Sequence, residues 1–333
     1  MTAAQVARRT VAGAAPLLLL AVAWQLRAVL LLFFAAGLVA IGLDGLARKL
    51  QRLLKLPRGI CLALSAIIAV TLGGWLGWMF GHEFDLQVRQ LVDILPGGWR
   101  DLQDWLGEDR VNGLAERLSP SGSNILAILQ SLASLVASLM SALFLAVIGG
   151  IFLAAAPQTY VQGWLLLMPR AHERRAGEVL HAVGGALRGW LRAQLVSMLF
   201  VGISIFAGLM AIGTPSPLAL AGIAAILGFV PVIGPLMAAV PAVLVGLTMG
   251  MDDLVRIALL YFVVQNVDGN IVNPLVMRHV IKIPPAVTMF SLFAVGVLLG
   301  PVGVLLGGPI TVLLFTLTRH LWVSAALGKP VPA

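Results

Sequence analysis

The chain has 333 residues, of which 60% are hydrophobic and only 11% are charged. Soluble globular proteins have about a quarter of their residues charged, so this composition argues against a soluble enzyme, a disordered chain and a nucleic-acid-binding protein. The net charge of +8 is expected to set the orientation in a membrane rather than to bind polyanions. The single cysteine, Cys61, excludes an internal disulfide and a cysteine-built metal site.

The first predicted unit, residues 1–80, contains three apolar runs that are expected to form transmembrane helices. These runs are residues 11–24, 28–43 and 59–80. The first two are separated by only three residues, which predicts a tight helical hairpin. Arg8 and Arg9 before an apolar run also resemble the start of a signal peptide. Because a second apolar run follows at once, we expect the first span to be retained.

The segments between the apolar runs alternate in charge, which predicts the side of the membrane on which each lies. Residues 44–59 carry five basic residues against one acidic residue, and residues 157–192 carry five against two. Both are therefore expected in the cytoplasm, the second within a basic helical segment, 157–193. Residues 81–123 carry eight acidic residues against four basic ones and are expected to form an extracytoplasmic loop of amphipathic helices. A transmembrane helix is predicted at 124–156.

Residues 194–320 are predicted to form a transport core, followed by a cytoplasmic tail at 321–333. The uncharged run 193–251 would be about 88 Å long as one helix, and the run 283–318 about 54 Å, whereas the hydrocarbon core is about 30 Å thick. Each run must therefore cross or enter the membrane more than once. Glycine and proline near the middle of each run cannot continue a regular helix. These breaks are Pro231, Gly234 and Pro235 in the first run, and Gly300, Pro301 and Gly303 in the second.

The charges that flank each broken run place its two ends on the same side of the membrane. This predicts two re-entrant hairpins, the first opening outward and the second inward, around a polar span at about 254–277. Two kinked but complete spans in each run would leave the ends on the same sides, so this alternative stays open. The predicted fold class is an all-α membrane protein: a polytopic helical bundle with two oppositely oriented broken or re-entrant helical hairpins in its C-terminal half.

Glycines recur every four residues on several predicted helices, which is typical of close helix packing within or between subunits. These glycines are Gly73, Gly77 and Gly81, then Gly296 with Gly300, and Gly303 with Gly307.

The span 254–277 contains the main polar cluster of the apolar regions. Asp268 is the only carboxylate deep in a predicted membrane segment, where an isolated acid costs about 2.5–3.5 kcal/mol, so it should face a cavity or a partner. The cluster forms two neighbouring helical stripes, which are Gln265 with Asp268, and Asn266 with Asn270 and Asn273. Two interpretations remain open: a pathway for a substrate, ion or proton, or a structural knot that bonds to the backbone of the broken helices.

No motif of a soluble enzyme is present, since the sequence has no P-loop, no nucleophile elbow and no pair of histidines at metal-ligand spacing. We therefore expect no catalytic activity, no metal site, no cofactor and no ATP-driven transport by this chain alone.

With these motifs in place, the chain resembles the autoinducer-2 exporter family of polytopic membrane transporters, which includes PerM-like permeases. The likeness covers about residues 11–317. The residues that carry it are Pro231, Gly234 and Pro235, then Gln265, Asp268 and Pro274, then Pro285, the segment Gly300-Pro301-Val302-Gly303, and Pro309. The family usually has a glutamate where this chain has the shorter Asp268. It often has an acid at the end of the fourth span, where this chain has Ala156-Pro157.

The resemblance implies a multi-pass transporter of a bacterial-type inner membrane. Some members of the family are associated with export of a small furanone-like signal, and others with exchange of sodium or lithium for protons. The resemblance also implies a homo-oligomer, and a pentamer is the assembly that it suggests.

Three functions compete: an exporter of a small polar organic molecule, a Na+(Li+)/H+ antiporter that uses Asp268, and a membrane scaffold without transport. An antiporter usually needs ionisable groups that titrate near the working pH, and only Asp268 is present, with no buried lysine or histidine visible. This favours the organic exporter. A pure scaffold has no need of irregular backbone at membrane depth. The expected partners are the lipid bilayer and a small-molecule or cation substrate, and no nucleic acid.

The charge bias predicts that both chain termini are cytoplasmic and that residues 81–123 are outside. In a Cys61→Ala background, Arg110→Cys should react with a membrane-impermeant thiol reagent only from the outside. Labelling of intact cells and of inverted vesicles measures this. Reaction of position 110 only from the cytoplasmic side would contradict the topology.

Overall fold

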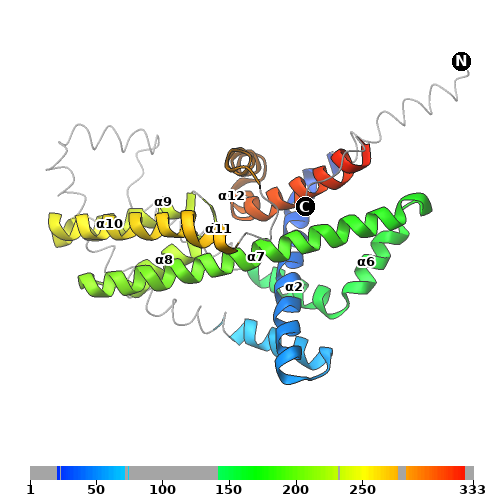
Figure 1. Cartoon of the computed structure of the whole chain (residues 1–333), viewed down its shortest axis with the longest axis horizontal. Coiled ribbons are helices and arrows are strands. Elements are labelled where there is room, and N and C mark those ends of the chain that lie inside the picture. The colour runs from blue at the N-terminus through cyan, green and yellow to red at the C-terminus, as the bar shows by residue number, and fades with distance from the viewer. Residues whose placement is uncertain are drawn as a thin grey trace, which may run out of the picture.

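The computed structural model describes residues 21–22, 24–71, 74, 142–231, 233–276 and 283–326, and within these ranges the regular elements are all helices. Four of the helices are long and apolar enough to cross a membrane, or five if one bent pair forms a single span. The predicted class, an all-α polytopic helical bundle, is confirmed (Figure 1). The predicted outer loop 81–123 and the glycines Gly73, Gly77 and Gly81 lie outside the described residues.

The N-terminal region consists of helix α2, Arg27–Leu54, a shorter helix at Arg58–Thr71, and a helix at Ala142–Ala155. Lys55 ends α2 in the left-handed conformation. The helix Ala142–Ala155 approaches α2 closely at two glycines: a Cβ on Gly150 would lie 2.7 Å from Val39 Cβ, and one on Gly149 would lie 3.1 Å from Ala36 Cβ. Small residues at such a contact let the two backbones come together, as in membrane helix pairs.

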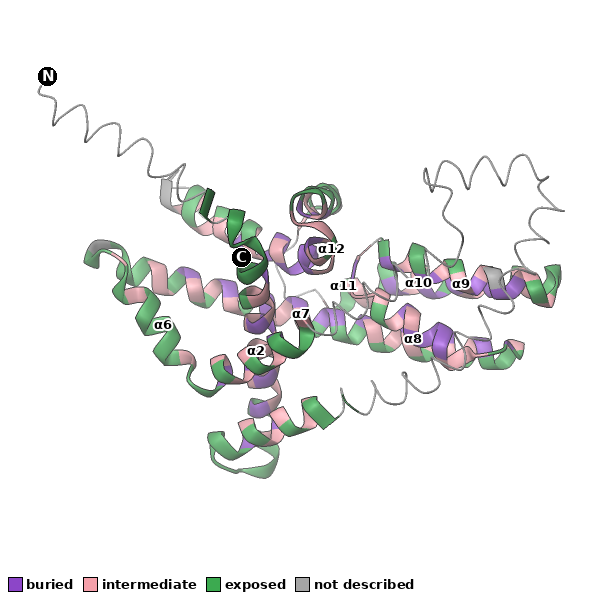
Figure 2. Ribbon diagram, turned by 180° about the vertical axis from the view of Figure 1, so that it is seen from behind, coloured by how far each residue is buried: buried purple, intermediate pink, exposed green. Residues whose placement is uncertain are grey.

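Helix α6, Pro157–Leu166, follows at a bend of 82°. The bend falls where the apolar run 124–156 ends and Pro157 begins a new helix, because the residue before a proline is disfavoured in the helical region. None of the residues in α6 is buried, as Figure 2 shows.

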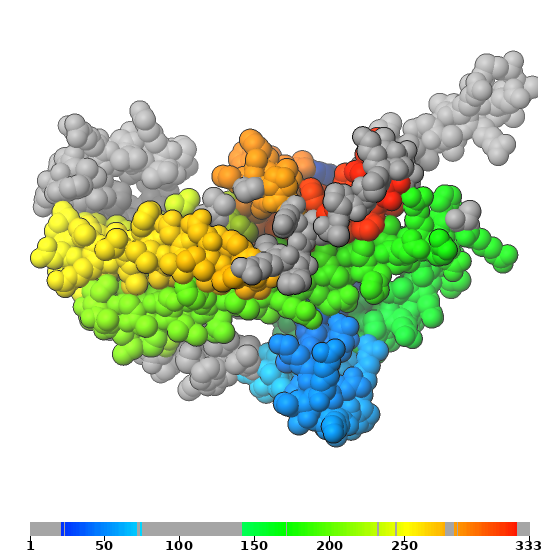
Figure 3. Space-filling model, viewed as in Figure 1, coloured from blue at the N-terminus to red at the C-terminus, as the bar shows by residue number. Residues whose placement is uncertain are grey.

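Helix α7, Arg170–Ile212, is the axis on which the other elements pack. With 43 residues it is about 64 Å long, and it runs continuously through the expected boundary at 193–194. Its basic first half crosses α2, whereas its apolar second half lies beside α8, Pro217–Leu227, and α10, Met251–Val267. Helices α7 to α10 form one elongated block from which α2 projects (Figure 3).

The first broken run forms a helical hairpin of α8 and α9, Ile233–Met249, joined through residues 228–231. The two helices have 11 and 17 residues, or about 16 and 26 Å, so neither alone reaches across a core about 30 Å thick. Gly234 stands where only a hydrogen fits, because a Cβ there would overlap the carbonyl oxygen of Leu227. Pro235 lies in the first turn of α9, where a missing N–H costs nothing.

The second broken run, α12, Pro285–Leu317, also folds back on itself. Gly300 has φ 70° and ψ −157°, a backbone conformation that is essentially restricted to glycine. Beyond this kink the two arms pack together: a Cβ on Gly296 would lie 2.8 Å from Val304 Cγ2, and one on Gly307 would lie 2.5 Å from Leu292 Cδ1. These glycines therefore allow close contact within the hairpin. A π-helix, η3, Thr318–Ala326, follows.

The close contact at Gly234 generates a stability prediction. Gly234→Ala should lower the free energy of unfolding by at least about 1–3 kcal/mol, because the added methyl forces the hairpin tip apart. Gly45→Ala, in the interior of α2 with nothing within 4 Å of its Cβ position, is the matched control and should be neutral or stabilising. Denaturant unfolding of the two purified variants measures the difference. Equal stability of the two would contradict the tight tip.

Candidate functional site

The candidate site is a group of polar side chains between α7 and the polar span, which we call the polar cluster. Its members are Gln194 and Ser197 from α7, Gln265 from α10, Asp268 from the following π-helix η1, Asp268–Val272, and Asn273 from α11, Asn273–Val276. The cluster lies next to the tip of the first hairpin, to which Gln194 bonds directly.

Asp268 is the centre of the cluster. Its residue is only 7% exposed. The Ser197 hydroxyl donates a hydrogen bond of 2.7 Å to Asp268 Oδ2, and Asn273 Nδ2 donates one of 3.3 Å to the same oxygen. The other oxygen, Oδ1, is buried and has no partner among the described residues. Hydrogen bonds thus hold one oxygen of the carboxylate in place, while the other oxygen is an acceptor without a donor in the described residues.

The π-helix at Asp268–Val272 has a local cause. Pro274 has no N–H to donate to the carbonyl of Asn270, so the regular bonding pattern must change before it. The N–H of Asn273 instead bonds to the carbonyl of Asp268, five residues earlier. A single π turn of this kind shifts the register of the side chains and often occurs at functional sites. It also brings the Asn273 amide within hydrogen-bond distance of the Asp268 carboxylate.

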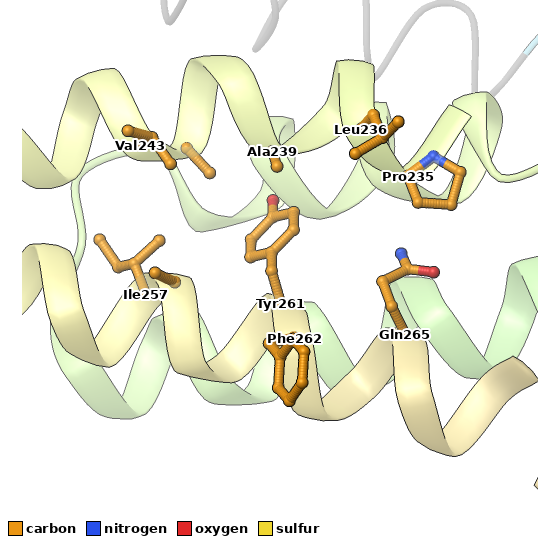
Figure 4. A pocket seen from close by; sticks show the side chains of 10 residues that line it. Pro235, Leu236, Ala239, Val243, Ile257, Tyr261, Phe262 and Gln265 are labelled. Atoms are coloured by element: carbon orange, nitrogen blue, oxygen red, sulfur yellow. The ribbon is translucent and has the colours of Figure 1, made fainter. Parts of the chain in front are cut away.

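Gln265 lies one turn before Asp268 on the same side of the helix. Its Nε2 is buried and has no partner in the part of the chain that the structure describes. The side chain closes one end of an apolar groove of about 300 Å³ between α9 and α10, opposite Pro235 (Figure 4). Tyr261, one turn earlier, lines the same groove and donates a hydrogen bond of 3.4 Å to the carbonyl of Leu220. One end of the groove therefore lies at Gln265, whose amide donor has no partner among the described residues.

Gln194 connects the cluster to the hairpin tip. Its Nε2 donates a hydrogen bond of 2.7 Å to the carbonyl of Gly228, one of the carbonyls left open where α8 ends. Neither Gln194 nor Ser197 is among the residues predicted from the sequence. The available signal was their spacing of three residues within an otherwise apolar span, which places both on one helix face.

Two residues of the predicted polar stripes lie elsewhere. Asn266 and Asn270 are exposed, and each donates a hydrogen bond to a carbonyl one turn earlier in its own helix. The structure therefore brings Gln265, Asp268 and Asn273 together but leaves Asn266 and Asn270 on the outer face.

Both hairpins contact Trp190 of α7, the first through its tip and the second through its C-terminal arm. The Phe229 ring, at the first tip, meets the Trp190 ring edge-to-face with centroids 5.5 Å apart. In the second hairpin, a Cβ on Gly308 would lie 2.7 Å from Trp190 Cζ2. Leu299 and Val302, on either side of the second kink, pack on the same apolar cluster. The two predicted breaks thus share one packing core.

Comparison with known proteins identifies the family. The sequence matches the AI-2E family transporter profile over residues 14–322. The chain belongs to the AI-2E transporter family. It is a multi-pass membrane protein, and the relatives that it matches are named as transport proteins.

Three relatives illustrate the family likeness. "Putative transport protein YueF" of Bacillus subtilis is 24% identical over 83% of this chain and 79% of its own length. "Putative transport protein YrrI" of the same species is 31% identical over 46% of this chain and 44% of its own length. "Putative transport protein YhhT" of Escherichia coli is 35% identical over 40% and 38% respectively. The match thus spans less than half of the length of YrrI and of YhhT.

The hydrogen bond from Ser197 to Asp268 generates the second stability prediction. Ser197→Ala should lower the free energy of unfolding by about 1–3 kcal/mol, because the buried Oδ2 then keeps only the longer bond from Asn273. The matched control is Ser204→Ala, two turns further along α7 and half-buried, where no hydroxyl bond is found in the described residues. Unfolding of both variants in detergent measures the effect. A loss at Ser204 as large as at Ser197 would contradict the assigned bond.

Proposed function

We propose that this member of the AI-2E transporter family is a secondary transporter that exports a small polar organic molecule through a pathway beside the polar cluster. One observation carries the proposal: Gln265 Nε2, a donor, and Asp268 Oδ1, an acceptor, are both buried and both without a partner in the described part of the chain. A buried polar atom without a partner costs about 1–3 kcal/mol, so a ligand that satisfies both is favoured. A molecule that carries a hydroxyl group can do this, because a hydroxyl accepts from Gln265 Nε2 and donates to Asp268 Oδ1.

The second candidate is a Na+(Li+)/H+ antiporter in which Asp268 carries the exchanged ion. The buried carboxylate with one unused oxygen supports it. A cation would satisfy Asp268 Oδ1 but would leave the neighbouring amide donor of Gln265 unused, because a donor does not coordinate a cation. This asymmetry favours the organic substrate. The third candidate is a membrane scaffold that transports nothing, and it predicts no solute flux.

The hairpin geometry supports the proposed transport role. Both arms of the first hairpin, and the first arm of the second, are too short to cross a bilayer core about 30 Å thick, as expected for re-entrant elements that open from opposite sides. Their tips share the packing core around Trp190. We propose that residues 194–320 form the transport core, with residues 1–80 and 124–156 as membrane helices around it and residues 81–123 outside.

We further propose that the protein lies in the inner membrane with both termini cytoplasmic, and that it is a homo-oligomer. The exposed amides of Asn266 and Asn270 support an assembly, because polar side chains within a membrane span almost always face a protein partner or a water-filled cavity. The pentamer suggested by the sequence resemblance is the assembly to test.

A pair of substitutions separates the two transport chemistries in proteoliposomes. Asp268→Asn should abolish gradient-driven transport of either kind while the folded yield changes little, because the amide keeps the size of the side chain and most of its hydrogen bonds. Gln265→Leu should weaken transport of a furanone-type solute by about threefold to tenfold, the value of one lost hydrogen bond, and should leave cation–proton exchange unchanged.

The measurements are solute flux, and cation-driven proton flux, each expressed per folded protein. Ser204→Ala, which changes a half-buried serine of α7 outside the polar cluster, is the control for general damage to the transport core. Normal coupled transport by Asp268→Asn would exclude Asp268 as a carrier and would leave it a structural role. Loss of cation–proton exchange in Gln265→Leu would favour the antiporter.

A further inference from the structure

A second cavity lies beside the first half of α7 and has a different chemistry from the polar cluster. It has a volume of about 360 Å³, within the range of small-molecule sites. Its walls come from α2, the helix Ala142–Ala155, α6 and the first half of α7. The apolar walls include Ile41, Leu153, Val161 and Leu180, while Asp44, His181 and Arg188 supply charged and polar groups. The cavity thus combines apolar walls with a charged edge.

The charged edge has an excess of positive charge. Asp44 is already paired, with Arg48 at 2.7 Å and Arg58 at 3.4 Å. Arg188 lines the cavity, is half-buried, and makes no ion pair or hydrogen bond with any residue that the structure describes. It lies within electrostatic range of Asp44, Arg48 and Arg192. One carboxylate therefore cannot neutralise the guanidinium groups gathered here, and an anion would.

The position of the cavity along the sequence places it at the edge of the hydrocarbon region. Asp44 is the first charged residue after the apolar run 28–43, and Pro157 directly follows the run 124–156. Arg192 is the last charged residue before the long uncharged run 193–251. Two apolar segments thus end at the walls of the cavity, and a third begins about one helical turn beyond it. Groups at this depth meet the phosphates of lipid headgroups on one side and acyl chains on the other.

Helix α6 adds an independent observation. It turns away from the helix Ala142–Ala155 by 82° and has no buried residue. Tyr160 and Trp164, the aromatic residues that prefer the membrane–water interface, are both about half exposed on it. Because Pro157 and Val161 of α6 form part of the cavity wall, this wall is built from an element with interfacial character.

We infer that this cavity binds the headgroup phosphate of an anionic phospholipid, with Arg188 as the main phosphate ligand and with acyl chains along the apolar wall. The inference is independent of the transported substrate. The charge bias of residues 44–59 and 157–192 assigns the site to the cytoplasmic leaflet.

The test uses the purified full-length chain in a neutral detergent with equal amounts of phosphatidylglycerol and phosphatidylcholine, and counts the retained lipids by native mass spectrometry. The wild type should retain phosphatidylglycerol in preference. Arg188→Gln should lower its retention by about fivefold, the value of one basic side chain near an anionic headgroup. Arg175→Gln, an exposed arginine on the same helix that does not line the cavity, should retain as much as the wild type.

A second pair of variants tests the cavity without changing charge. Gly184→Leu places a side chain into the cavity, where a Cβ meets only the Arg188 guanidinium at 3.8 Å, and should lower phosphatidylglycerol retention. Gly185→Leu, on the exposed side of the same helix turn, should not. Both changes favour the helix, so folding is preserved. Equal retention of the two lipids by the wild type, equal losses in variant and control, or displacement of the lipid by millimolar inorganic phosphate would overturn the inference.

Discussion

The hydrogen bond between Ser197 and Asp268 is the directional contact on which the arrangement of the C-terminal half depends. Between apolar helices in lipid there is little hydrophobic drive for association, so close packing and polar contacts must specify which faces meet. The bond fixes the rotation of α7 relative to the polar span. Gln194 likewise fixes the position of the tip of the first hairpin, because its side chain donates a hydrogen bond to the carbonyl of Gly228.

An interrupted helix in an apolar environment must satisfy the backbone groups that it releases, because no bulk water is available to do so. The structure meets this requirement differently at its two main breaks. At the first tip, a side chain from another helix supplies the missing donor. At the second, the chain reverses at Gly300, whose backbone conformation is essentially restricted to glycine. The small residues Gly296 and Gly307 then let the two arms pack together. Trp190 contacts both hairpins, so one side chain of α7 takes part in the packing of each.

Two sites of contrasting chemistry result. Within the part of the chain that the structure describes, the polar cluster offers one unused donor and one unused acceptor around a buried carboxyl group, as the proposed transport of a polar solute requires. The cavity between α2, α6 and α7 offers unbalanced positive charge beside apolar walls, which suits an anionic amphiphile. Both sites are built on α7, the polar cluster on its apolar half and the cavity on its basic half. A single long helix thus contributes residues to both sites.

The sequence by itself determined the class of the protein, the location of its helix breaks and the presence of a sheltered acid, Asp268, in the polar span. The length of each apolar run can be compared with the thickness of the bilayer without knowledge of any tertiary contact. The inability of glycine–proline segments to continue a helix is also a local property of the chain. The side chains that surround Asp268 were not determined in this way. Helical spacing predicted neighbouring stripes, but the π turn before Pro274 brings Asn273 to Asp268 and leaves Asn266 and Asn270 outside. Ser197 is 71 residues away along the chain, and only the packing of α7 against the polar span makes it a partner.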